Sequence, residues 1–324
     1  MNHIYRIFIA AICVCFSITT AAQKVDYSVV SVPEEVGLEL KIITSDNDMV
    51  AMPLVRRGLS GIQWVTGRVM DIAPNDSTLA FISNRDKTTN IYVKALGRHS
   101  ASIKRTNRTG VMDLSYSPDG KVICFSEEVG RSRQLFQTDA FQGFVCRQIT
   151  NGSMDYGPVY SQDMTKVFFS RKESRGYSIW SYDLKEKYLS NYTLGMNPFV
   201  MNNGQILCSR SNAEGRGEIW IIDLEKGTEE CIISDSKISF SSPVLSPDGK
   251  RIAFVGGTPL PYKNRSYWNT DIYVCNVDGT DLQQVTYHAA DDLCPIWSMD
   301  GQFLYFISQR GSESACANIW RITL

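Results

Sequence analysis

Short alternations of apolar and polar residues fill this chain, and they recur at a regular interval. The run VMDLSYSPDGKVICFS at 111–126 has a near copy, SSPVLSPDGKRIAFV, at 241–255. In each copy an alternating segment reaches Ser-Pro-Asp-Gly, where Pro presets φ for a turn corner and Gly accepts the positive φ that closes a short hairpin. A more apolar strand follows at once. The pattern therefore predicts a repeated β-hairpin.

Six such units align along the chain, with turns expected at 73–76, 117–120, 161–164, 202–204, 246–249 and 298–301. Each turn precedes a second strand (79–83, 122–126, 167–170, 206–209, 252–255 and 304–308) and a third (90–93, 134–137, 178–182, 218–222, 271–274 and 318–322). A spacing of about 40 to 50 residues is that of a four-stranded blade. No useful helical periodicity lies between the strands. We therefore predict an all-β, six-bladed β-propeller over residues 39–324.

The last unit ends inside a third strand, so its blade lacks an outer strand. The segment ELKIIT at 39–44 resembles the outer-strand segment CRQIT at 146–150. We expect this N-terminal strand to pair with the C-terminal blade, which removes an open sheet edge. The stretch 45–67 is too long for an ordinary turn and is expected to form an ordered loop on one face.

The first 22 residues have the pattern of a secretory signal peptide. Basic residues precede an apolar run at 7–18, and small residues lead to a predicted cleavage after Ala22. The apolar run is too short to span a bilayer, and no later stretch qualifies. Ile12 and Val14 precede Cys13 and Cys15 where a lipoprotein signal has a small residue, so lipidation is not expected. We predict a periplasmic or secreted protein whose residues 23–38 form a lead-in.

Composition narrows the partners. The 33 basic and 34 acidic residues give a net charge of -1. A charge this close to zero does not predict binding to nucleic acid or to an anionic membrane. Seven cysteines follow the leader, and an odd number cannot pair completely within one chain. Cys124 and Cys208 fall at comparable places in two second strands, which suits small buried hydrophobes. We expect a monomer with mostly free core thiols.

The repeat resembles the six-bladed TolB-like propeller family. The resemblance rests on the WSPDG-type turns at 117–121, 246–250 and 297–301, and on SNRD at 83–86 leading into NIYV at 90–93. It covers residues 39–324 and implies a bacterial protein of the periplasm or envelope. TolB itself has a separate N-terminal domain and acts as a protein-interaction partner, whereas only residues 23–38 precede the propeller here. Related propellers gate dipeptidyl-peptidase-like hydrolases or form pectic-oligosaccharide lyases.

The sequence lacks the catalytic residues that either kind of related enzyme needs. A hydrolase of this kind needs a G-x-S-x-G nucleophile elbow, which is missing. The resemblance to the lyases implies a metal held by clustered histidines, but only His99 and His288 follow the leader. We therefore predict no cofactor and no metal, and we favour a non-catalytic protein.

The fifth unit carries a distinctive insertion, GGTPLPYKNRSYWNT at 256–270. Exposed aromatic residues on loops are enriched at binding surfaces, so the insertion is the first candidate site. Residues expected on it or on loops of the same face are Tyr262, Arg265, Tyr267, Trp268, Asp155, Tyr156, Phe240, His288, Asp291 and Asp292. Alternatively, Tyr267 and Trp268 fold back to plug the channel or brace a blade.

Two charged patterns are interpreted as structural or solvated features. Arg85, Arg171, Arg210 and Arg310 follow four second strands and are expected to make a contact built into each blade, not a ring for an anion. Asp291 and Asp292 are expected to be a solvated acidic pair and not a cation site.

We predict an exported binding module that holds a protein partner on its insertion-bearing face. The alternative is a propeller that binds or processes a glycan in its central channel through Asp155, His288, Asp291 or Asp292. Converging carboxylates and a His in an open pocket would favour the enzyme, whereas an apolar rim or a plugged channel would favour partner binding.

Overall fold

The computed structural model describes residues 25–57, 62–64, 67–97, 100–174, 176–262 and 265–324. The side chains of residues 56–66 and 260–267 are also outside this description. The predicted signal peptide at 1–22, with its cleavage after Ala22, lies outside the described residues. Within them, no helix is long and apolar enough to cross a membrane.

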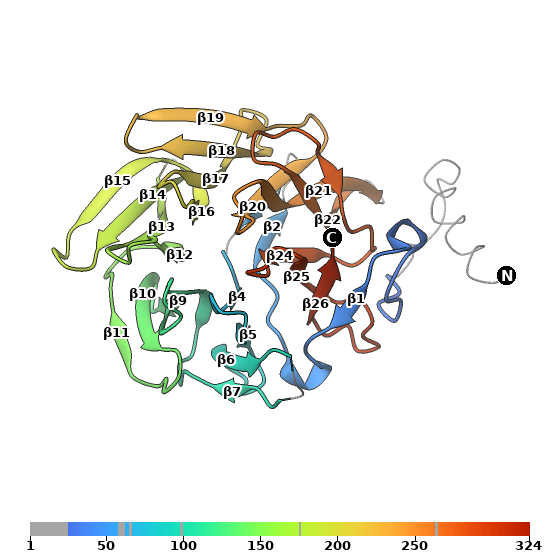
Figure 1. The fold of residues 1–324 in the computed structure, drawn as a ribbon, viewed down its shortest axis with the longest axis horizontal. Coiled ribbons are helices and arrows are strands. Elements are labelled where there is room, and N and C mark those ends of the chain that lie inside the picture. The colour runs from blue at the N-terminus through green and yellow to red at the C-terminus, as the bar shows by residue number, and fades with distance from the viewer. Residues whose placement is uncertain (1–24, 58–61, 65–66, 98–99, 175, 263–264) are drawn as a thin grey trace.

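Six four-stranded antiparallel sheets surround a central axis and form the blades of a propeller, which confirms the predicted fold (Figure 1). Blades 1 to 3 comprise β4 (Met70–Ile72), β5 (Thr78–Ser83), β6 (Asn90–Ala95) and β7 (Ile103–Lys104); β8 (Val111–Tyr116), β9 (Val122–Val129), β10 (Ser132–Asp139) and β11 (Cys146–Gln148); and β12 (Asp155–Tyr160), β13 (Lys166–Glu173), β14 (Gly176–Asp183) and β15 (Leu189–Leu194). Blades 4 to 6 comprise β16 (Met196–Val200), β17 (Ile206–Ser211), β18 (Gly217–Asp223) and β19 (Thr228–Ile233); β20 (Ser239–Leu245), β21 (Arg251–Tyr262), β22 (Arg265–Asn276) and β23 (Gln283–Gln284); and β24 (Asp292–Trp297), β25 (Phe303–Ser308), β26 (Asn318–Thr323) and β1 (Leu40–Ile42).

The turns between the first and second strands of the blades follow the repeated sequence pattern. In blade 2 the N–H of Gly120 donates to the carbonyl of Ser117 at 2.8 Å, and Ser117 Oγ donates to Asp119 Oδ1 at 2.6 Å. Gly120 has a φ of 70°, which glycine adopts without steric cost. Equivalent turns start at Ala73, Ser161, Met201, Ser246 and Ser298. All six lie at the same end of the blades, which we call the turn face.

The N-terminal strand closes the ring, as predicted. β1 pairs antiparallel with β26, placing Leu40 opposite Ile322. Just beyond β1, the hydroxyl oxygen of Thr44 accepts the N–H of Ile319 at 2.8 Å and lies 3.0 Å from Asn318 Oδ1, to which it donates. Thr44 is buried, so water does not compete for these hydrogen bonds, which hold the segment after β1 against β26.

Replacing Thr44 by Val is expected to lower the free energy of unfolding by about 1 to 3 kcal/mol. Val fills a similar volume but leaves the N–H of Ile319 without a partner in a buried place. Urea unfolding measures the loss. Thr228→Val, at an exposed position of β19, is the matched control and should change stability by about 0.5 kcal/mol or less. Equal midpoints for the two variants would show that Thr44 does not fasten the closure.

Residues 25–38, predicted only as a lead-in, dock on blade 6. The N–H of Gly311 donates to the carbonyl of Val29 at 2.9 Å. The short 3₁₀ helix η1 (Pro33–Glu35) then directs Glu35 into the protein, where Arg310 Nη1 lies 2.8 Å from its carboxylate. Both side chains are fully buried. The lead-in is therefore part of the folded blade.

Two segments predicted as loops contain hairpins. The ladder between β21 and β22 continues through the blade 5 insertion until Tyr262 faces Arg265. Its aromatic and β-branched residues favour strands. Cross-strand pairing also gives hydrogen-bond partners to backbone N–H and C=O groups that would bind water in a loop. The segment 45–67 contains the 3₁₀ helix η2 (Asp46–Asp48) and the strand pair β2 (Val55–Arg57) and β3 (Ile62–Trp64). The β21–β22 connection lies at the end of blade 5 opposite its β20–β21 turn, and we call this side of the ring, opposite the turn face, the insertion face.

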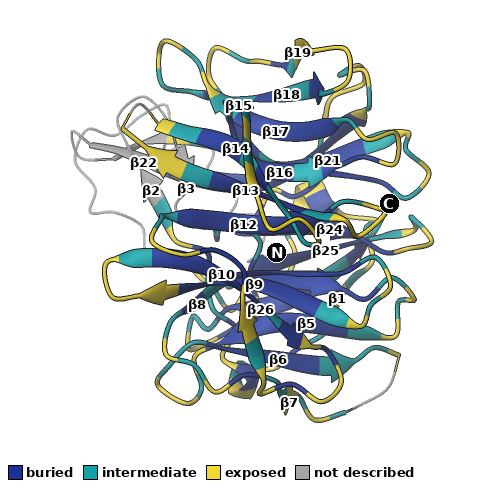
Figure 2. Ribbon diagram, turned by 90° about the vertical axis from the view of Figure 1, so that its left-hand side faces the viewer, coloured by how far each residue is buried: buried dark blue, intermediate teal, exposed yellow. Residues whose placement is uncertain are grey.

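Apolar side chains from neighbouring blades form the core, and the inner and middle strands are mostly buried (Figure 2). None of the seven cysteines in the described residues is paired. Cys124, Cys208, Cys275 and Cys294 are buried. The prediction of mostly free core thiols is therefore confirmed.

Candidate functional site

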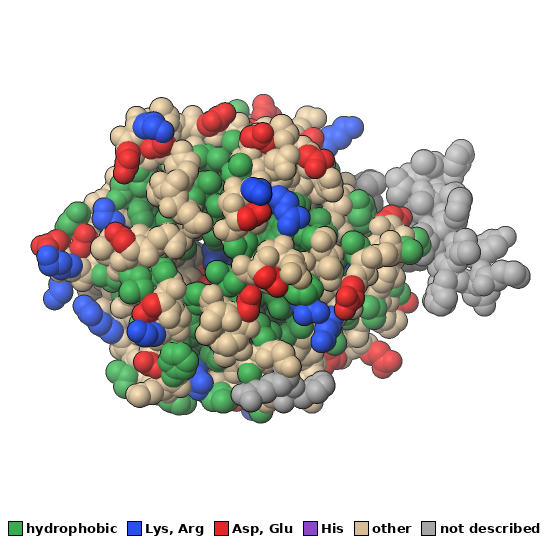
Figure 3. Space-filling model, viewed as in Figure 1, with side chains coloured by type: hydrophobic (Ala, Val, Ile, Leu, Met, Phe, Trp, Pro, Cys, Tyr) green, Lys and Arg blue, Asp and Glu red, His purple; other side chains and the backbone are tan. Residues whose placement is uncertain are grey.

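The central channel opens on the turn face as a wide cavity, which we call the funnel. Its volume is about 260 Å³. Residues of the six turns form its mouth, among them Gln162, Asn202, Pro247 and Met299. Figure 3 looks onto this face and shows the hollow at its centre.

Each blade contributes the residue two places before its turn to the funnel wall. In blade order these residues are Asp71, Ser115, Val159, Phe199, Val244 and Ile296. The next residue of each strand also lines the funnel: Ile72, Tyr116, Tyr160, Val200, Leu245 and Trp297. The wall is therefore mostly apolar, with one polar sector on the adjacent blades 1 and 2.

Arg68 lies at the inner end of the polar sector, where it lines both the funnel and the narrower channel beyond it. Its Nη1 lies 3.3 Å from Asp71 Oδ1, and its guanidinium carbon lies 5.5 Å from the centre of the Phe199 ring. It is the one basic side chain among the described residues that line the funnel. In Figure 3, basic side-chain atoms are visible within the central hollow.

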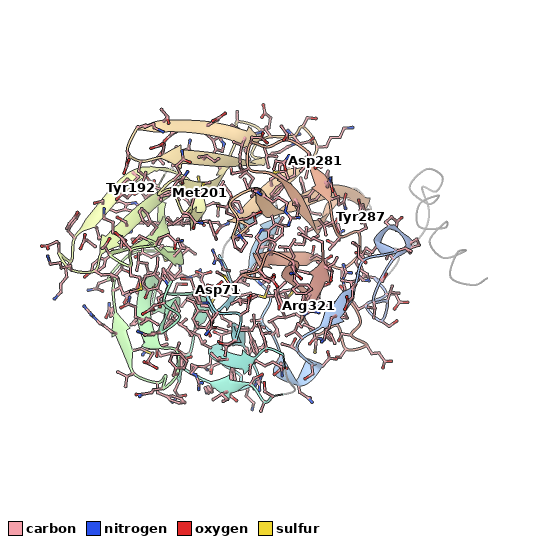
Figure 4. The ribbon with its side chains drawn as sticks, in the orientation of Figure 1. Asp71, Tyr192, Met201, Asp281, Tyr287 and Arg321 are labelled. Carbon is pink, nitrogen blue, oxygen red and sulfur yellow. The ribbon has the colours of Figure 1, made fainter. Side chains whose placement is uncertain are left out.

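Asp71 is held in the wall by backbone groups. Its Oδ2 accepts the N–H of Tyr116 at 2.8 Å, and its Oδ1 accepts the N–H of Ile72 at 3.1 Å. Burial raises the pKa of Asp71, and the charge of Arg68 opposes that rise. Figure 4 labels Asp71 near the centre of the ring, well inside Tyr192 and Asp281 at its margin. Asp71 thus fixes the position of the Arg68 guanidinium.

Ser115 is the second polar member of the sector. Its exposed fraction is 1%, and its Oγ has no hydrogen-bond partner among the described residues. An unpartnered buried hydroxyl is costly and rare in folded proteins. Ser115 borders the funnel, but its hydroxyl oxygen is itself buried in the wall.

Beyond Arg68 the channel narrows to about 30 Å³. Gly157, Asn197, Ser242 and Cys294, each followed by Pro, surround the narrow part. Their φ angles are 55°, 53°, 56° and 55°, and the register of each inner strand shifts at this point. These bulges bring backbone close to the axis. The remaining space suits about one water molecule.

Most of the predicted binding residues are buried. Asp155, Tyr156, Phe240 and Asp292 lie at or near the starts of inner strands, Trp268 lies within β22, and His288 lies in the connection between β23 and β24. The exposed fractions are 0% for Asp155, 4% for Tyr156, 0% for Phe240, 2% for Trp268, 1% for His288 and 0% for Asp292. Trp268 is part of the main apolar core, so the bracing alternative holds for this residue.

The other predicted binding residues fall into two groups. Asp291 is half-buried and accepts Thr270 Oγ1 at 2.8 Å, so it is not simply a solvated loop residue. The side chains of Tyr262, Arg265 and Tyr267 lie outside the described residues. None of the seven predicted residues whose side chains are described lines the funnel or the narrow channel.

The four arginines after the second strands make contacts within the blades, as predicted. The guanidinium carbons of Arg85, Arg171, Arg210 and Arg310 lie over the rings of Tyr92, Trp180, Trp220 and Phe306. Their carboxylate partners are Asp48, Asp155, Glu229, and Glu35 together with Asp292. These groups are occupied and do not form a binding ring.

Five buried ionisable residues gather where the lead-in meets blades 5 and 6: Glu35, Asp271, His288, Asp292 and Arg310, which we call the polar cluster. Burial, with the nearby charge of Asp292, raises the pKa of Asp271 to about 9. Burial also raises the pKa of Asp292 to about 6 and lowers that of His288 to about 4. The cluster is packed beneath the lead-in and away from the funnel. Across the described residues, no three His, Cys, Asp or Glu side chains assemble as a metal site would require.

The funnel residues were missed by reasoning from sequence, which examined loops and not inner strands. The signal was nevertheless present. When the six turns are aligned, the position two residues before each turn is polar only in blades 1 and 2, at Asp71 and Ser115.

Comparison with known proteins agrees with this architecture. Residues 188–322 match the family model of the TolB β-propeller domain. A putative TolB from Agrobacterium tumefaciens has a TM-score of 0.57 and 16% identity, covering 82% of this chain and 94% of its own. An oligogalacturonate lyase from Vibrio parahaemolyticus has a TM-score of 0.57 and 12% identity, covering 91% of this chain and 95% of its own. Identities this low show the fold alone.

A curated relative shares a shorter segment. Dipeptidyl-peptidase 5 of Porphyromonas gingivalis is 28% identical over 86 residues, which are 26% of this chain and only 12% of that protein. Fold and cavity together define a six-bladed propeller with a funnel along its axis. Residues 188–322, from the outer strand of blade 3 to the last strand of blade 6, match the TolB β-propeller family model, and the whole ring has the fold seen in TolB.

Proposed function

We propose that this protein is an exported, non-catalytic module that binds another protein in the periplasm or cell envelope, and that the funnel receives a segment of that partner. The observation that best supports binding is the composition of the funnel wall. It is mostly apolar and concave, with one basic side chain, Arg68, and one carboxylate, Asp71, which backbone amides already hold. Apolar cavities with a few fixed polar groups are typical of binding sites.

Catalysis has less support in this site. General acid–base chemistry needs two titratable groups that reach the substrate, and no His is among the described residues that line the funnel. The shared fold with an oligogalacturonate lyase is the argument for the glycan alternative. Of the four residues assigned to that alternative, Asp155, His288 and Asp292 are buried and Asp291 is half-buried, and none of them lines the funnel.

Occluding the mouth of the funnel is expected to remove the partner. Asn202→Trp and Gln162→Trp place bulky rings at exposed mouth positions, so folding should be unaffected. In cross-linking pull-downs from the protein's own envelope fraction, each variant should recover at least about tenfold less of the protein captured by wild type, as for an obstructed binding hot spot. Asn151→Trp, exposed on the insertion face, is the matched control.

Three results would contradict the proposal. Equal recovery by the mouth variants and the control would remove the funnel as the site. Loss with Asn151→Trp alone would assign the partner to the insertion face, near Tyr262, Arg265 and Tyr267. Turnover of oligogalacturonate by the wild-type protein would favour the glycan alternative.

A further inference from the structure

We propose that the partner segment enters the funnel by its C-terminus, and that Arg68 binds the terminal carboxylate. This inference rests on the proposed function, because it names the part of the partner that the funnel receives. It follows from the free donors of Arg68 and the narrowing of the channel beyond it.

Arg68 has donors to spare. A guanidinium carries five N–H groups, and in the described residues only Nη1 has a hydrogen-bond partner, Asp71 Oδ1 at 3.3 Å. The side chain is 17% exposed and lines the funnel, so Nε and Nη2 can be reached from it. Two adjacent N–H donors of an arginine match the two oxygens of a carboxylate.

Asp71 does not prevent a second carboxylate from binding. Its two oxygens already accept the backbone N–H groups of Tyr116 and Ile72. The same chain shows that one guanidinium can hold two carboxylates, because Arg310 pairs with both Glu35 and Asp292. A ligand carboxylate can therefore join Arg68 while Asp71 stays in place.

The shape of the channel selects a chain end. Arg68 stands where the funnel of about 260 Å³ gives way to a space of about 30 Å³. A polypeptide that reaches Arg68 has no room to continue past it, so the group that arrives there is a terminus or the tip of one side chain. A basic residue at the narrow end favours the terminus that carries negative charge.

The wall indicates a peptide and not a sugar. Val159, Phe199, Val244 and Ile296 offer apolar surface around most of the funnel, which suits the side chains of an apolar C-terminal sequence. A uronic acid would also bring a carboxylate, but its hydroxyl groups would lose water against these residues without finding partners.

The test uses a displayed library of random nonapeptides that end in a free C-terminus, selected on the purified full chain. Selected sequences are synthesised with a terminal carboxylate or a terminal amide, and both forms are measured by calorimetry. The acid is expected to bind at least about tenfold more tightly than the amide. This comparison needs no substitution, so it remains informative whatever a variant does to folding.

Substitutions then test whether Arg68 is the residue that distinguishes the acid from the amide. Arg68→Met should bind the acid and the amide equally, whereas Arg321→Met should keep the preference, because Arg321 also lies over a phenylalanine ring, Phe303, but outside the funnel.

The outcomes separate this inference from the proposed function. Peptides that bind equally as acid and amide, yet are lost in Asn202→Trp, would overturn the C-terminal inference and leave the funnel as a protein-binding site. Preference for an internal Glu or Asp over the terminal carboxylate would also overturn it. Peptides unaffected by Asn202→Trp, or no selected peptides, would count against both. Tighter binding of digalacturonate than of any selected peptide would favour the glycan alternative.

Discussion

Replacing Arg310 by Met is expected to lower the free energy of unfolding by about 3 to 5 kcal/mol. The guanidinium lies between the carboxylates of Glu35 and Asp292, and all three side chains are 0% exposed. Met retains much of the apolar packing over the ring of Phe306 but none of the charge. Two carboxylates would then be buried without a counter-charge, which is the costly way to break a buried ion pair.

Arg210→Met is the matched control, because Arg210 occupies the equivalent place in blade 4. Its partner Glu229 is 37% exposed, so water replaces much of the lost interaction, and a loss of about 1 kcal/mol or less is expected. Urea unfolding at pH 7 compares the two variants. Similar losses for both would show that burial of the Arg310 pair does not set its contribution.

The wild-type protein is expected to lose stability as the pH rises from 7 to 9. Burial and the charge of Asp292 raise the folded-state pKa of Asp271 to about 9, far above the ordinary value of an aspartate. The folded state therefore binds a proton that the unfolded chain has released. The stability linked to that proton is complete below about pH 4 and disappears as the pH approaches 9, at about 1.4 kcal/mol per pH unit. The expected loss between pH 7 and 9 is about 2 to 3 kcal/mol.

Asp271→Asn should remove this dependence, because asparagine stays neutral and keeps an oxygen for the Nδ2 group of Asn269, which lies 3.2 Å from Asp271 Oδ2. The range above pH 7 isolates the effect. His288, whose pKa burial lowers to about 4, contributes in the opposite sense only where the pH falls below about 6.5. Thermal melts from pH 7 to 9 measure both proteins. Parallel slopes would show that Asp271 is ionised throughout.

The fold could be predicted from the sequence because its signals are local. Each Ser-Pro-Asp-Gly turn and the apolar strand after it lie within one short segment, and six copies align. The contact between Glu35 and Arg310 joins residues 275 positions apart, and nothing in the lead-in itself indicates it. The hairpin in the blade 5 insertion was missed because aromatic residues in a long connection fit a loop as well as a strand.

The candidate site could not be predicted in the same way. Binding residues were sought in loops, but the ends of inner strands, such as Asp155, meet the neighbouring blade and are buried there. Conversely, Asp71 and Ser115 lie in strands that look purely structural. Whether a strand residue faces the axis depends on how six sheets tilt around it, and the spacing of one repeat does not contain that information.

The pairing of β1 with β26 also determines when the protein can fold. Residues near position 40 leave the ribosome early, but their partners near position 322 are made much later. Until then blade 6 has no outer strand, and the edge of every partial ring is free to pair with other chains. Contacts across almost the whole chain form slowly, because a large loop must close before they contribute. The ring is therefore completed only once β26 has been made, and the growing chain needs protection from aggregation for as long as β1 and β26 remain apart.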